Sequence, residues 1–178
     1  MESCPEFAFL VPEVRTNIAY CLPDAQSPGD VAAVDGRITV VGNRPKAAGP
    51  VRFGASDHLA RRIIELRKYD QRIRAALNFR WNERILEFMN FYCAHHSLRL
   101  GKVKRAAEPK ELVGQDQASM PWKVRQLVEA SDSKVPPVFY ETRGWGKEPL
   151  FFLVGPDPVG LAEMSVDIAR QLASGTIP

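Results

Sequence analysis

The sequence has little of what marks a secreted, zinc-binding or membrane protein. It has only three cysteines in 178 residues, Cys4, Cys21 and Cys93, with no C-x-x-C spacing. A disulfide framework is therefore not expected, and a reducing cytoplasm is the predicted location. No apolar run approaches the ~20 residues of a membrane-spanning helix. The N-terminus also lacks the basic segment and long apolar stretch of a signal peptide, so we expect no membrane partner.

Charge of one sign is also scarce. Lys and Arg number 24 against 21 Asp and Glu, and 24 − 21 gives +3. This excess is too small to indicate nucleic acid by itself. Residues 61–84 hold eight Lys or Arg and three acids, so 8 − 3 gives +5 there. A solvated helix surface is the commonest reason for such a run, although a phosphorylated small molecule needs the same charge. We predict no nucleic-acid partner.

What is present fits a globular chain, with 45% hydrophobic and 25% charged residues. The length suits one domain, predicted over residues 1–178, with an extended N-terminal lead-in at residues 1–9. Strands are predicted at 15–22, 37–41, 51–53, 73–79, 98–103, 138–140 and 150–154. Helices are predicted at 57–69, from Asn82 to Cys93, from Pro121 onward and after Asp157, with a brief turn at 27–30.

Strands and helices alternate along the chain, which predicts the α/β class. Several connections are too short for a crossover helix, so the sheet should be mixed and partly antiparallel. Residues 42–50 and 108–119 are expected to be loops.

The segment GASDH joins a predicted strand to a basic helix and contributes five candidate residues. A helix N-terminus offers free backbone N–H groups to an anion, and small residues let a phosphate approach the backbone. The alternative is a plain turn with capping residues and a surface histidine, and the segment alone favours it because it matches no complete phosphate loop. The candidates are Gly54, Ala55, Ser56, Asp57 and His58.

A second glycine-containing segment, RGWGK, precedes the last predicted strand. Two glycines allow the backbone to wrap an anion, and the basic side chains supply charge. The alternative, a hairpin loop whose tryptophan packs on the core, is equally compatible with the pattern. The candidates are Arg143, Gly144, Trp145, Gly146 and Lys147.

Asn78 and Arg80 end a predicted strand and, by its period of two, should share one side of it. They form a candidate pair for a polar ligand, with an edge strand and solvated face as the alternative. The remaining histidines, His95 and His96, are adjacent and give no persuasive metal set. Metal ligands stay unassigned.

Five segments together resemble one family. The chain resembles the archaeal ThiN-type thiamine-phosphate synthase domain in four segments that occur in this order, FGASDHLAR (53–61), IRAALNFRW (73–81), SMPWKV (119–124) and GWGKEP (144–149). The upstream segment at 10–42 also resembles the opening of that domain. The resemblance covers about residues 10–172. It implies a three-layer α/β/α sandwich with a mixed sheet, of the kind found in class II aldolase-like proteins. Family members usually carry an aspartate where Glu141 stands.

The resemblance also implies an activity, the coupling of hydroxymethylpyrimidine diphosphate with hydroxyethylthiazole phosphate to give thiamine phosphate and pyrophosphate. The family's functional arginine and histidine fall on Arg37 and His58, and Trp122 joins the candidate ligand-binding residues. Phosphorylated pyrimidine and thiazole molecules are then the partners, with Mg²⁺ accompanying the pyrophosphate. The alternative is a non-catalytic domain that senses thiamine phosphate for a transcription regulator.

These expectations lead to three structural predictions. Residues 54–58, 78–80 and 143–147 should meet in one anion site at strand ends. His58 and Arg37 should act in the chemical step, with the resting charge of His58 left open, while Lys147 holds a phosphate. A homodimer is expected, because Phe151, Phe152 and Trp122 near element ends suggest an exposed apolar patch.

Overall fold

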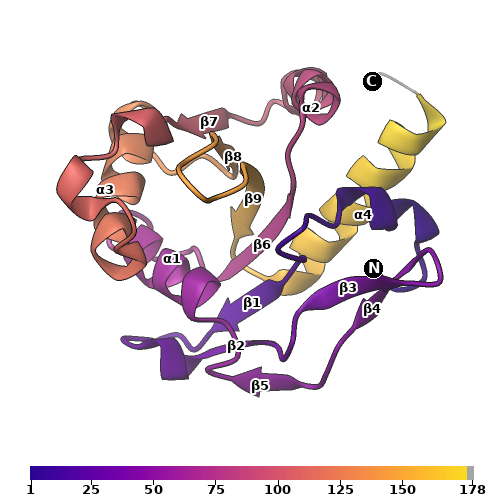
Figure 1. The fold of residues 1–178 in the computed structure, drawn as a ribbon, viewed down its shortest axis with the longest axis horizontal. Helices are drawn as coiled ribbons and strands as arrows, with labels where there is room; N and C mark the ends of the chain where they lie inside the picture. The colour runs from indigo at the N-terminus through magenta and orange to yellow at the C-terminus, as the bar shows by residue number, and fades with distance from the viewer. Residues whose placement is uncertain (176–178) are drawn as a thin grey trace.

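A seven-stranded mixed sheet forms the centre of the protein (Figure 1), with the strand order β5-β2-β1-β6-β9-β8-β7. This computed structural model describes residues 1–175, without the side chain of Asp116, so 176–178 of the predicted domain lie outside the described residues. β7 and β8 are parallel and the other neighbours are antiparallel. The strands are β1 (Ile18–Cys21), β2 (Val31–Val34), β5 (Val51–Phe53), β6 (Ala75–Arg80), β7 (Leu100–Val103), β8 (Val138–Glu141) and β9 (Leu150–Gly155).

Helices cover both faces of this sheet and make three layers, as predicted. α1 (Asp57–Arg67) and α3 (Asp116–Glu129) pack on one face, and α2 (Glu83–His95) and α4 (Pro158–Ser174) on the other. The central strands β6 and β9 are buried almost throughout. Burial on both faces explains why these two strands are nearly continuous apolar runs rather than alternating ones.

The starts of α2 and α4 agree with the capping signals in the sequence. The Asn82 side chain accepts a hydrogen bond from the backbone N–H of Ile85 at the start of α2. The Asp157 carboxylate accepts from the backbone N–H groups of Val159 and Gly160 at the start of α4. Both side chains satisfy donors that the first helical turn leaves without partners.

A β-hairpin replaces one of the predicted loops. β3 (Ile38–Val41) pairs with β4 (Arg44–Ala47) in a separate two-stranded sheet, so the prediction of a structureless connection at 42–50 was wrong. Gly42 and Asn43 form the two-residue turn, both with positive φ. Glycine and asparagine tolerate this backbone conformation, which matches the twist of the paired strands.

Two other boundaries differ from the predictions. The N-terminal lead-in is not extended, because residues Pro5–Leu10 form the 3-10 helix η1, whose Phe7 and Leu10 are buried. α3 begins at Asp116 and contains Pro121 inside it, rather than starting there. Proline is favoured in a first helical turn, but Met120 is also buried, and burying it extends the helix backward past the proline.

The apolar patch behind the homodimer prediction is absent from the described surface. Phe151 and Phe152 are both fully buried, and Trp122 is half-buried against the α1 and α3 core. These residues do not support a homodimer, so the oligomeric state stays a prediction. Within residues 1–175, no helix has the length and apolar character needed to cross a membrane.

Candidate active site

A cavity of about 370 Å³ lies at the end of the sheet where β6 and β8 finish and β1 and β9 begin. Its walls come from segments far apart in the sequence. The N-terminus of α1, the loop before β9 and the segment before β1 all contribute. The lining residues are Glu13, Val14, Asn17, Arg37, Ser56, His58, Leu59, Asn78, Arg105, Glu141, Gly146, Lys147, Glu148 and Leu150.

Two buried asparagines build the wall next to β1. The backbone N–H of Asn17 donates to Asn78 Oδ1 at 2.9 Å, and Asn78 Nδ2 donates to the carbonyl of Arg15 at 3.0 Å. Asn17 Nδ2 in turn donates to the Val34 carbonyl at 2.9 Å. Because these amides are occupied by backbone groups, Asn78 shapes the cavity and holds the 15–17 segment against β6.

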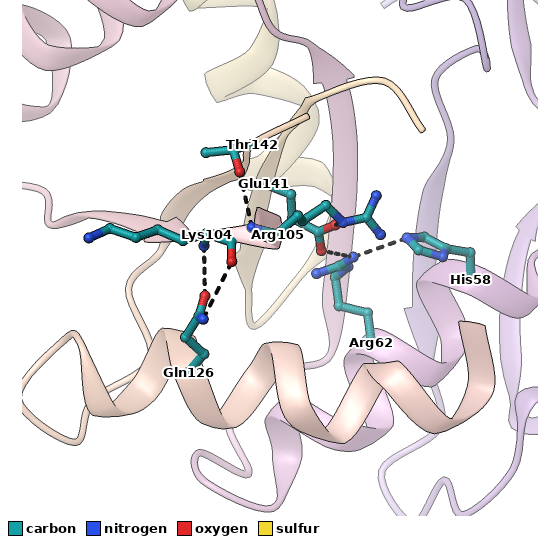
Figure 2. Close-up of polar contacts among 7 residues, drawn as sticks. All are labelled: His58, Arg62, Lys104, Arg105, Gln126, Glu141 and Thr142. Atoms are coloured by element: carbon teal, nitrogen blue, oxygen red, sulfur yellow. Dashed lines mark hydrogen bonds and ion pairs between the residues drawn. The ribbon is translucent and has the colours of Figure 1, made fainter. Parts of the chain in front are cut away.

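Glu141 lies at the centre of a buried ionic network (Figure 2). Arg62 Nη2 donates to Glu141 Oε1 at 2.5 Å, and Arg105 Nε lies 3.0 Å from Glu141 Oε2. All three side chains are at most 4% exposed. Burial alone would raise the pKa of Glu141, but the positive charges of Arg62, Arg105 and Lys123 together lower it to about 2. The carboxylate is therefore ionised at neutral pH.

Lys123 on α3 adds a third buried cation behind Glu141. It is fully buried, and its Nζ has no hydrogen-bond partner among the residues that the structure describes. Burial, with repulsion from Arg105 and Arg62, lowers the pKa of this ammonium to about 8, although Glu141 and Glu108 oppose the shift. Three cations thus face two carboxylates, and positive charge remains in excess behind the cavity.

Two hydrogen bonds hold the backbone at Arg105 in place. Its backbone N–H donates to Thr142 Oγ1 at 3.0 Å, and the preceding Lys104 N–H donates to Gln126 Oε1 of α3 at 2.6 Å. A Cβ on Gly144 would lie 3.2 Å from the Arg105 Cδ, tighter than nearly all real contacts. The glycine therefore leaves room for the arginine to reach Glu141.

His58 lies in the first turn of α1 with its ring against the network. Arg62 Nη2 lies 3.0 Å from His58 Nε2. Burial, and then the charge of Arg62, lower the pKa of His58 to about 3, while Glu141 acts in the opposite direction. The imidazole is therefore neutral at physiological pH, which answers the question of resting charge that the sequence left open.

Comparisons with known proteins identify the family of this chain. The family described as "Thiamine-phosphate synthase ThiN" matches residues 1–167. The chain belongs to the ThiN family. The thiamine-phosphate synthase ThiN of Methanothermobacter thermautotrophicus is 36% identical over 98% of this chain and 89% of that protein.

Two further matches are a longer, bifunctional protein and a solved C-terminal domain. The bifunctional thiamine biosynthesis protein ThiDN of Methanocaldococcus jannaschii is 30% identical over 92% of this chain, which spans 36% of that protein. The crystal structure of a C-terminal domain of phosphomethylpyrimidine kinase superposes with a TM-score of 0.82 at 34% identity, covering 93% of this chain and 88% of that one. Membership of the ThiN family supports a role in thiamine biosynthesis.

The ThiN fold brings six of the candidate residues to one cavity. Three of these lie at the start of α1 or on β6, and the other three lie before β3 or in the loop before β9. They are Arg37, Ser56, His58, Asn78, Gly146 and Lys147. Each of the predicted segments, 54–58, 78–80 and 143–147, therefore contributes one or more residues to the same cavity.

The other candidates lie beside the cavity or away from it. Gly54, with a positive φ, makes the turn before α1, Ala55 lines a shallow neighbouring hollow with Arg37, and Asp57 pairs with Arg61. Arg143, Gly144 and Trp145 line an adjoining cavity of about 230 Å³, together with Arg105 and Lys147.

Two candidates do not line the main cavity. Arg80 donates to the Val11 carbonyl and lines a separate cavity near α2 and α4. The predicted pairing of Asn78 with Arg80 was wrong, because β6 ends at Arg80 and strand alternation no longer fixes the direction of its side chain. Trp122 packs against the α1 and α3 core rather than lining the cavity.

The ionic network was not predicted from the sequence. Arg62 belongs to the basic run at 61–84, for which a solvated helix surface was the commonest explanation. It instead occupies the same face of α1 as the buried Leu59 and Leu66, three residues after one and four before the other. Lys123 similarly follows Met120 by three residues and precedes Leu127 by four. A basic residue within an apolar helical stripe was the signal that could have revealed both.

Proposed function

We propose that this protein is a thiamine-phosphate synthase, which joins hydroxymethylpyrimidine diphosphate to hydroxyethylthiazole phosphate. The C–O bond to the diphosphate breaks, and its electron pair leaves with pyrophosphate. The thiazole nitrogen lone pair then forms the new C–N bond, so the products are thiamine phosphate and pyrophosphate. The observation that carries the proposal is the cavity with excess positive charge behind it, in a chain of the ThiN family.

The site supplies what this reaction needs. The leaving pyrophosphate requires preorganised cations and hydrogen-bond donors, because its charge develops as the C–O bond breaks. Arg37 and Arg105 line the cavity, with the helix N-terminus of α1 beside them, and Lys147 on the same wall is placed to hold a phosphate. No covalent nucleophile is required by this route, and the bond changes need no proton transfer from the protein.

Two cavities suit two phosphorylated substrates. The main cavity and the adjoining one share Arg105 and Lys147 as lining residues. We propose that the substrates occupy one cavity each, with these two cations between their phosphates. Trp145, which is 88% exposed in the adjoining cavity, is placed to stack on a flat ring. Trp145→Ala should then raise the KM of one substrate and leave the other nearly unchanged.

The side chains present fit a Mg²⁺ ion that arrives with pyrophosphate. Mg²⁺ is usually held by substrate phosphates, water and one or two carboxylates. Glu13 and Glu148 line the cavity and would provide such carboxylates. Within residues 1–175 no group of three or more His, Cys, Asp or Glu could hold a metal by itself. When bound, the ion would supply positive charge to the leaving group.

An assay of the purified protein tests the proposed function. Both phosphorylated precursors and Mg²⁺ are mixed with the protein, and thiamine phosphate and pyrophosphate are measured. We expect equal amounts of the two products. A protein that binds thiamine phosphate but forms none would contradict the proposal and favour a sensing role.

His58→Ala is the sharpest variant for the chemical step. Loss of one preorganised hydrogen-bond donor at a developing charge lowers kcat by about 10²–10³. KM should change less, and Lys134→Ala, an exposed substitution outside the cavity, is the control. Wild-type turnover in His58→Ala would remove His58 from the catalytic machinery.

A further inference from the structure

The contact between His58 and Arg62 determines more than the position of the ring. Arg62 is one helical turn after His58 on α1, and its Nη2 reaches both His58 Nε2 at 3.0 Å and Glu141 Oε1 at 2.5 Å. The guanidinium carbon lies 3.8 Å from the centre of the Phe152 ring. Arg62 is thus fixed by an anion, an aromatic face and full burial, and has little freedom to leave His58.

A guanidinium has five N–H donors and no acceptor, and it stays protonated in proteins. The only favourable contact with Arg62 therefore has His58 Nε2 as the acceptor. Nε2 then carries no proton, and the proton of the neutral ring is on Nδ1. An imidazolium, or the opposite tautomer, would place an N–H against the N–H of Arg62.

The charges around His58 also favour the neutral imidazole. The ring is faced by Arg62 from its own helix, Lys123 from α3, Arg105 from η3 (Arg105–Ala107) and Glu141 from β8. Three cations and one carboxylate disfavour a second proton on the imidazole. Among the described residues, no other hydrogen bond of this ring is found, so Nδ1–H is available to a ligand.

We propose that Arg62 is a positioning residue that holds His58 as the neutral Nδ1–H tautomer, so that His58 gives the bound pyrophosphate group a hydrogen bond and keeps its proton. This inference rests on the proposed function for the identity of the ligand, but not for the state of the ring. Departure of pyrophosphate is then assisted by a fixed donor rather than by an acid.

Nitrogen-15 NMR of the histidine side chains in the wild-type protein tests the tautomer directly. The chain has three histidines, and a His58→Asn variant identifies the His58 signals. We expect an unprotonated Nε2 and a protonated Nδ1, with no titration of His58 between pH 5 and 9. A protonated Nε2, or titration of His58 within this range, would overturn the inference.

Inorganic pyrophosphate is then added to the same sample. We expect the Nδ1–H proton to shift downfield and to exchange more slowly with water, while Nε2 stays unprotonated. Conversion of His58 to imidazolium on binding would overturn the proposal. If pyrophosphate does not bind at all, the proposed function fails, whereas the spectrum of the free protein still decides the tautomer.

Variants of Arg62 separate positioning from folding. Arg62→Met removes the donor, and we expect Nε2 to become partly protonated and kcat to fall about 10–10²-fold, because the ring is no longer aligned. Arg62→Lys keeps a side chain that only donates hydrogen bonds, and it should restore part of the unprotonated Nε2 and part of the lost kcat. Arg61→Met is the matched control, since Arg61 pairs with Asp57 outside the cavity. If Arg62→Met left the tautomer unchanged, the positioning role would be wrong.

Discussion

Phe151 and Phe152 are neighbours on β9, yet they lie in different chemical surroundings. Phe151 faces α2 and α4 and stacks on Phe79, in a core of apolar side chains. Phe152 faces α1 and α3, and its ring lies under the Arg62 guanidinium and 6.3 Å from the His58 ring. The same residue type, one position apart, thus stabilises a core on one face and supports the site on the other.

The two phenylalanines mark a difference between the two faces of the sheet, because buried charged side chains lie on the α1 and α3 face. Burying charges is unfavourable unless they are paired and hydrogen-bonded. On the α1 and α3 face, Arg62, Arg105, Lys123 and Glu141 are all buried, and they lie at the cavity end of the sheet. Both faces also carry an extensive apolar cluster, so we infer that the ionic network on the α1 and α3 face is retained for the site rather than for folding stability.

Glu141→Gln should have the largest effect on stability. Removing this carboxylate leaves three buried cations without their central partner, so the free energy of unfolding should fall by about 3–5 kcal/mol. Denaturant unfolding measures the loss. Adding Arg62→Met to the same protein should recover part of it. A loss below about 1 kcal/mol, the value of an exposed pair, would show that the network is effectively solvated and would break the comparison.

A matched pair, Phe151→Leu and Phe152→Leu, sharpens the contrast between the faces. Each should cost about 1–2 kcal/mol of unfolding free energy, because each removes similar buried aromatic volume. Only Phe152→Leu also removes the face under Arg62, so only it should lower kcat. Equal kcat values in the two variants would show that the Phe152 ring does not support the site.

The pH dependence of stability should also identify the charged face. The pKa of His58 is about 3 in the folded protein, below the histidine value of about 6.5 in an unfolded chain. The unfolded chain therefore binds an extra proton as pH falls from about 6.5 toward 3, and stability decreases by up to about 1.4 kcal/mol per pH unit. Denaturant unfolding of wild type and His58→Asn between pH 6.5 and 5 should differ by this slope. Parallel curves would contradict the neutral assignment.

Lys147→Ala should have the smallest effect. Its side chain is half-buried and lines both cavities. Burial and repulsion from Arg105 lower the pKa of the ammonium. A point charge on a phosphate acts alike on the ground state and the transition state, so KM should rise about three- to tenfold with little loss of kcat. A fall in kcat with unchanged KM would instead move Lys147 to the chemical step.

Local patterns were enough for most of the fold. Alternating strands and helices predicted the α/β class, and the Asn82 and Asp157 caps located two helix starts. The β3–β4 hairpin was missed because Pro45 and the flanking glycines resemble a loop, and β4 borders only one partner strand. The start of α3 was missed because Pro121 imitates a first-turn proline.

The sequence by itself determined which residue types were available to the site and where the helix and strand ends would place them. His58 at a helix N-terminus and Lys147 in a glycine-containing loop were found in this way. Only the tertiary structure decided which charges are buried together, because Arg62, Arg105, Lys123 and Glu141 come from four separate elements. Their pairing depends on distances across the sheet, which no local pattern encodes, and that pairing sets the protonation of His58.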